Sequence, residues 1–87
     1  MNQNILFSDD KKWDDSRQCV IFFAQQAGQL IPCTASLGLL SELDGNSVTS
    51  QQQALEAFSR VQFDLEEMAE EAIEDETFSP NGEVILG

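Results

Sequence analysis

The sequence predicts an α+β fold, a small antiparallel sheet with three helices packed on one face. Three observations predict it: two β-rich runs flank a glycine in residues 19–36, apolar residues recur at helical spacing within residues 37–77, and a short apolar run, EVIL, follows the turn signal SPNG. We expect a single domain over residues 1–87, with a strand and a hairpin in residues 1–36, helices in 37–77 and a C-terminal strand in 83–86.

The first strand is expected at residues 4–7, which form a short apolar run. The polar stretch SDDKKWDDSR follows and is typical of a loop. It contains Trp13, the only tryptophan, which we expect to close one edge of the core, although tryptophan can also anchor a binding surface.

A β-hairpin is expected next, with Ala27 and Gly28 as a two-residue turn. This register gives one wholly apolar face, whose facing pairs are Val20 with Ala35, Phe22 with Cys33, and Ala24 with Ile31. It also places Cys19 and Cys33 on opposite faces, which excludes a disulfide between them and favours two structural thiols. The turn is the weak point, because it needs a positive φ that alanine disfavours.

The helical part begins at Ser36, a plausible N-cap for a short helix that ends at Asp44 and Gly45. Ser50 caps a second helix, whose apolar face consists of Ala54, Ala57, Phe58 and Val61. Phe63 breaks this spacing. Asp64 and Glu67 resemble a capping box, so a third helix is expected from Asp64, joined to the second by a tight bend.

The third helix, DLEEMAEEAIEDE at residues 64–76, is strongly acidic and has no basic residue. Apolar residues keep helical spacing within it, so it predicts a folded acidic face. Rows of carboxylates four residues apart repel one another, which permits but does not require selection for a basic partner. A solvated, solubilising face is the alternative interpretation. The candidate partner-binding residues are Glu66, Glu67, Glu70, Glu71 and Glu74.

A second candidate surface is the other face of the hairpin, which is half apolar. If no terminal segment covers it, it forms a patch of the kind that marks interfaces, and we expect a homodimer through it. The candidate self-association residues are Ile21, Phe23, Leu30 and Pro32.

The net charge of −12 argues against direct binding to nucleic acid or to an anionic membrane, since both depend on lysine and arginine. No apolar run is long enough to span a bilayer and no signal peptide opens the chain, so we expect a cytoplasmic protein. The chain has no histidine. We therefore expect no metal, no cofactor and no enzymatic activity.

Several short motifs, taken in order, resemble a known family of small bacterial proteins. They are the opening MNQNILF, the tryptophan in KKWD, Val20-x-Phe22-x-Ala24, Gly28, Ile31-x-Cys33 and AFSRVQFDLEEMAEEAI. The family is the domain of unknown function 1488 (DUF1488), and the resemblance extends from Met1 to about Leu86. It implies a small cytoplasmic α+β protein of proteobacterial type and brings no catalytic residues.

The function that the sequence favours is a non-enzymatic protein-interaction module that presents an acidic helix. The alternative is a regulatory accessory to transcription, which acts through protein contact or by mimicking the charge of nucleic acid. A small enzyme that uses a carboxylate is the third hypothesis.

Overall fold

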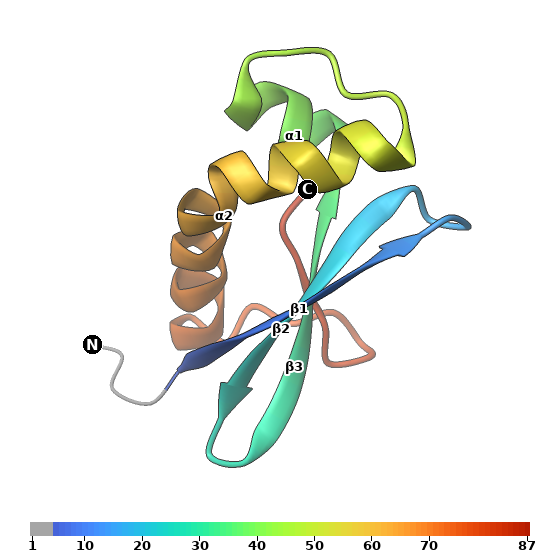
Figure 1. Ribbon diagram of the computed structural model, residues 1–87. Coiled ribbons are helices and arrows are strands. Elements are labelled where there is room, and N and C mark those ends of the chain that lie inside the picture. The colour runs from blue at the N-terminus through green and yellow to red at the C-terminus, as the bar shows by residue number, and fades with distance from the viewer. Residues whose placement is uncertain (1–4) are drawn as a thin grey trace.

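A β-hairpin forms the centre of the sheet in the computed structural model, which describes residues 5–87 (Figure 1). Strand β2 (Cys19–Gln26) pairs with β3 (Gln29–Ser36) in the predicted register, so that Phe22 faces Cys33. Ala27 and Gly28 form the turn, with φ values of 53° and 80°. The register prediction is confirmed, and all six apolar side chains of the predicted face are buried.

Strand β1 (Leu6–Asp14) pairs with β2 in antiparallel orientation, so the prediction of a loop through the polar stretch is wrong. The start of the predicted strand, Asn4, lies outside the described residues. A bulge between Phe7 and Lys11 absorbs extra residues, and Trp13 then pairs with Val20 and packs, partly buried, against the core. The backbone groups along the edge of β2 need partners, and this requirement overrides the weak strand preference of the polar residues.

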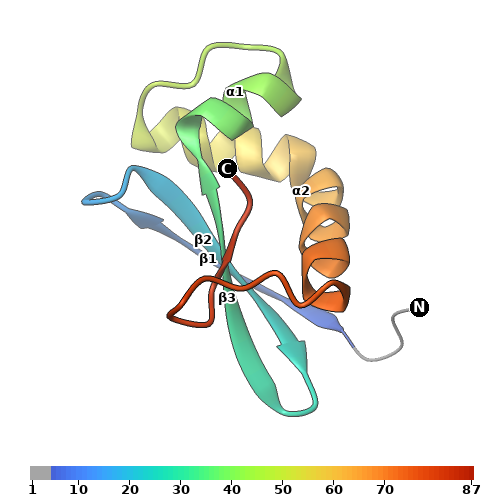
Figure 2. The ribbon, with the colours of Figure 1, turned by 180° about the vertical axis from the view of Figure 1, so that it is seen from behind.

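Strand β4 (Val84–Ile85) completes the sheet, whose order is β1-β2-β3-β4. It runs parallel to β3, with Val84 beside Cys33, so the predicted antiparallel sheet is wrong at this edge. The parallel direction of β4 follows from the connection between the two strands. In the sequence, both helices separate β3 from β4, and they return the chain toward the start of β3. Figure 2 shows the C-terminal segment running beside β3, where the Ser36 N–H donates to the Gly87 carbonyl at 3.0 Å.

In the described part of the chain, two helices cover one face of the sheet, so the prediction of three helices is wrong. Helix α1 (Leu37–Asp44) begins at Ser36, whose Oγ accepts from the Leu39 N–H at 3.1 Å, and Gly45 closes it with a φ of 78°. Helix α2 (Gln51–Glu74) begins at Ser50, whose Oγ accepts from the Gln53 N–H at 3.2 Å. These caps are the predicted ones.

The expected break before the acidic segment is a kink inside α2. Val61 departs from helical geometry, with φ −113° and ψ 19°, and the two halves run in clearly different directions (Figure 1). Asp64 is therefore an interior residue and not an N-cap. The bend lets both halves lay their apolar stripes on the sheet, while Phe63 stays 86% exposed.

The core lies between the helices and the inner sheet face. Both halves of α2 contribute to it, and its α2 members are Ala54, Ala57, Phe58, Val61, Leu65, Ala69 and Ile73. Cys33 belongs to this core, while Cys19 lies on the other sheet face, and both are buried free thiols. Burial raises the pKa of the Cys33 thiol to about 12. Within residues 5–87, no helix combines the length and the hydropathy needed to cross a membrane.

Candidate functional site

The acidic face of α2 lies directly opposite its buried stripe. Leu65, Ala69 and Ile73 point into the core, so helical spacing turns the carboxylates outward. The predicted residues are on this side of the helix: Glu67, Glu71 and Glu74 are exposed, and Glu66 and Glu70 are partly exposed. Four of them line a shallow groove of about 350 Å³ together with Met68, namely Glu67, Glu70, Glu71 and Glu74. The structure therefore brings these four residues together.

Within residues 5–87, none of the four basic side chains forms an ion pair with a carboxylate of this face. Arg60 donates to both carboxylate oxygens of Asp44, at 2.8 and 2.9 Å, and ties the end of α1 to α2. Arg17 pairs with Asp14 and Glu83. The two lysines lie over aromatic rings, with Lys11 Nζ 5.7 Å from the Phe58 centroid and Lys12 Nζ 6.0 Å from the Phe23 centroid.

The outer sheet face, turned away from the helices, carries the second predicted group. Phe23 pairs with Pro32 across β2 and β3; both are half-buried, as is Ile21, whereas Leu30 is 64% exposed. Two residues that the sequence reasoning missed extend this group. The outer apolar patch consists of Leu6, Ile21, Phe23, Leu30, Pro32 and Ile85.

The sequence reasoning missed Leu6 and Ile85 because it gave neither the first strand nor the C-terminal strand a pairing partner. Leu6 pairs with Gln25, and Ile85 lies beside Thr34, which puts both on the outer face. They are 66% and 59% exposed. Alternation along β1 and β4 would have revealed them if the pairing of these strands had been known.

A network of charged groups borders this face, and we call it the Arg17 network (Asp14, Arg17 and Glu83). Hydrogen bonds from Arg17 hold the pKa of the Asp14 carboxyl below its ordinary value. The thiol of Cys19 lies close enough to feel these charges, yet it is only 5% exposed, and burial raises its pKa. Cys19 is therefore packed as a structural side chain and is poorly suited to act as a nucleophile.

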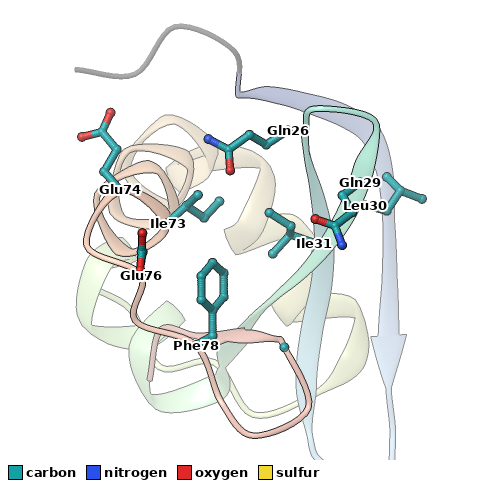
Figure 3. A pocket seen from close by; sticks show the side chains of 9 residues that line it. Gln26, Gln29, Leu30, Ile31, Ile73, Glu74, Glu76 and Phe78 are labelled. Carbon is teal, nitrogen blue, oxygen red and sulfur yellow. The ribbon is translucent and has the colours of Figure 1, made fainter.

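A pocket of about 610 Å³ opens between the C-terminal end of α2 and the β2–β3 hairpin (Figure 3). Ile31 from β3, Ile73 from α2 and Phe78 from the following loop point into it. Its rim is polar and includes Gln26, Gln29, Glu74 and Glu76. The sequence reasoning missed this pocket, and the one local signal for it is a single aromatic residue, Phe78, in the turn-rich segment TFSPNG.

The carboxylates and thiols of the described part of the chain form no cluster of three or more that could hold a metal ion. Three exposed features with distinct chemistry are the acidic face, the outer apolar patch and the Phe78 pocket. They belong to a small α+β protein whose helices cover one face of a four-stranded sheet.

The chain belongs to the family described as protein of unknown function (DUF1488), whose model matches residues 5–86. This confirms the resemblance seen in the sequence motifs.

Relatives match the chain along almost its whole length. It is 34% identical over 87 residues to the uncharacterized protein YrdB of Escherichia coli (strain K12), with 99% of each chain covered. It is 33% identical to the protein of the same name from Shigella flexneri, with the same coverage. A crystal structure of a DUF1488 protein of unknown function from Shewanella loihica PV-4 matches with a TM-score of 0.90 at 36% identity. That match covers 98% of this chain and 93% of the other, and it supports the α+β fold.

Proposed function

We propose that this protein is a non-enzymatic interaction module that presents the acidic face of α2 to a basic protein surface. The observation that carries the proposal is the absence, within residues 5–87, of any ion pair between a lysine or arginine and the carboxylates of this face. A face left without internal counter-charges attracts a partner that supplies them.

The placement of the basic side chains strengthens this reasoning. Arg60 lies at the end of the first half of α2, close in sequence to the acidic segment, yet its guanidinium points to Asp44. The Asp44 side chain is only 5% exposed. Within residues 5–87, the one polar contact of the acidic face with a neighbouring side chain is the bond from Gln62 Nε2 to Glu66 at 2.9 Å. The face is therefore free to form new contacts.

The face is also held in a fixed shape. Leu65 and Ala69 are fully buried beneath it, and Ile73 is 3% exposed. A helix anchored in this way presents its carboxylates without a large loss of conformational entropy on binding. This distinguishes it from a disordered acidic tail, which would have to order itself on its partner.

The experiment compares proteins captured from a cell lysate by the wild type and by two charge-matched variants. The test variant carries Glu67→Gln, Glu70→Gln, Glu71→Gln and Glu74→Gln. The control variant carries Asp9→Asn, Asp10→Asn, Glu42→Gln and Glu56→Gln, all at exposed positions away from the face.

Both variants lose the same net charge, so only the position of the lost charges differs. We expect the wild type and the control variant to capture a basic protein that the test variant does not capture. The affinity of that purified protein for the wild type should fall steeply with added salt. If both variants capture the same basic proteins as the wild type, the acidic face is only a solvated surface.

We further propose self-association through the outer apolar patch. A molecule with a net charge of −12 repels its own copy, so two copies meet most easily where the local charge is low. The outer face fits this condition, since Lys12 lies over Phe23 and the acids at its border, Asp14 and Glu83, are paired with Arg17. Leu6, Leu30 and Ile85 are among the most exposed large apolar side chains.

Sedimentation of Phe23→Glu tests this second proposal. Phe63→Glu is the matched control, because Phe63 is exposed on α2 and is not part of the patch. We expect the wild type and the control to sediment as dimers and Phe23→Glu to sediment as a monomer. A monomeric wild type contradicts the proposal.

A further inference from the structure

The Phe78 pocket joins apolar walls from three separate segments. Ile31 and Ile73 are 8% and 3% exposed and form its inner surface, whereas Phe78 is 40% exposed and stands at its entrance. Figure 3 shows the Phe78 ring directed between the two isoleucines. A volume of about 610 Å³ is ample for one large apolar side chain.

The rim of this pocket is acidic and attracts positively charged groups. Glu74 and Glu76 supply carboxylates, Gln26 and Gln29 supply amide groups, and no lysine or arginine is among its lining residues. An apolar interior with an anionic rim selects ligands in which an apolar side chain lies next to a cationic one, and it disfavours anionic ligands.

The pocket is continuous with the acidic face, because Glu74 lines both the pocket and the groove formed by Glu67, Glu70 and Glu71. A basic segment that lies along this half of α2 would therefore reach the entrance of the pocket at the end of the helix. One apolar residue beside the basic run would then be placed over Phe78.

We propose that the Phe78 pocket binds a large apolar side chain adjacent to the basic segment that the acidic face recognises. This inference rests on the proposed function and adds to it the kind of sequence that is recognised: several lysines or arginines followed or preceded by one residue such as leucine. The acidic face supplies long-range attraction, and the pocket supplies selectivity among basic partners.

The probes are three synthetic peptides of alternating lysine and glycine, one without leucine and one with a single leucine at either end. Affinity is measured by isothermal titration against the wild type, Phe78→Ser and the matched control Phe63→Ser, in which an exposed phenylalanine outside the pocket and outside the outer apolar patch is changed. Because Phe78 is partly exposed and lies in a loop, its replacement leaves the core intact.

We expect one leucine peptide to bind the wild type and Phe63→Ser about tenfold more tightly than the lysine–glycine peptide, since an apolar side chain leaves water. Phe78→Ser removes that advantage and leaves the affinity for the lysine–glycine peptide unchanged. The Gln variant of the acidic face weakens the binding of all three peptides.

Two results overturn the inference. If the wild type binds all three peptides equally, the pocket does not select an apolar side chain. The salt dependence of the lysine–glycine peptide then tests the acidic face separately. If Phe78→Ser instead converts a dimer into a monomer, the occupant is a second copy of the chain. Failure of the proposed function is distinct from both, because then the lysine–glycine peptide itself shows no salt-sensitive binding.

Discussion

The Arg17 guanidinium donates hydrogen bonds to both carboxylate oxygens of Glu83, at 3.0 Å from Nη1 and 3.2 Å from Nη2. Its Nε donates to Asp14 at 3.0 Å. One side chain thus connects the turn between β1 and β2 to the residue before β4. Since β4 is only two residues long, this connection restrains a strand that has few backbone hydrogen bonds of its own.

We expect Arg17→Ala to loosen the C-terminal segment. The N–H of Leu86, which donates to the Thr34 carbonyl, should exchange with deuterium faster in the variant, while amides in the β2–β3 hairpin keep their protection. Arg17→Lys is the control: it retains the charge but cannot form the two parallel bonds, so we expect an intermediate rate. Unchanged exchange at Leu86 in both variants would contradict this role.

Stability should fall in acid because of two paired carboxyl groups. The hydrogen bond from Arg17 lowers the pKa of Asp14 from its ordinary value of 3.8, and Arg60 does the same for Asp44. A carboxyl group with a lowered pKa in the folded state stabilises the fold fully above its unfolded pKa. This contribution is lost as the pH falls below 3.8 and through the folded values.

Urea unfolding across a series of acidic pH values measures this loss. The control is the double variant Asp14→Asn and Asp44→Asn, which has no carboxyl group to titrate at these positions. We expect its stability to depend less on pH in this range than that of the wild type. Equal pH dependence of the two proteins would contradict the prediction.

Two apolar residues of α2 that lie two positions apart have opposite environments. Leu65 is fully buried and Phe63 is 86% exposed. We expect Leu65→Ala to lower the free energy of unfolding by about 3 kcal/mol, because it leaves a cavity in the core. Phe63→Ala should change it by less than about 0.5 kcal/mol. Comparable losses for both in urea unfolding would contradict the burial of Leu65 and the exposure of Phe63.

Helix capping distinguishes one kinked helix from two consecutive helices. Ser50 accepts from the Gln53 N–H, so Ser50→Ala should cost about 1 kcal/mol of stability. Asp64 lies inside α2 and caps nothing, so Asp64→Ala should be neutral or slightly stabilising. Thermal unfolding of both variants is the measurement. A loss at Asp64 as large as that at Ser50 would indicate that a new helix begins there.

Local patterns in the chain were enough to predict the hairpin and the caps. The pairing of Phe22 with Cys33 follows from alternation, because a slip by one residue would turn every core side chain to the other face. Ser36 and Ser50 were identifiable as caps because hydroxyl residues satisfy free N–H groups at the first turn of a helix. The acidic face was predictable for the same kind of reason, since spacing along one helix sets which residues share a side.

The remaining features depend on residues that are far apart in the chain. The polar stretch around Lys11 became a strand because the edge of β2 required a partner, and β4 took its direction from the helical crossover. The kink at Val61, the bond from Arg17 to Glu83 and the pocket at Phe78 likewise arise where separate elements meet. A local pattern encodes which face of an element is apolar, whereas contacts between elements follow from packing the whole chain around one core.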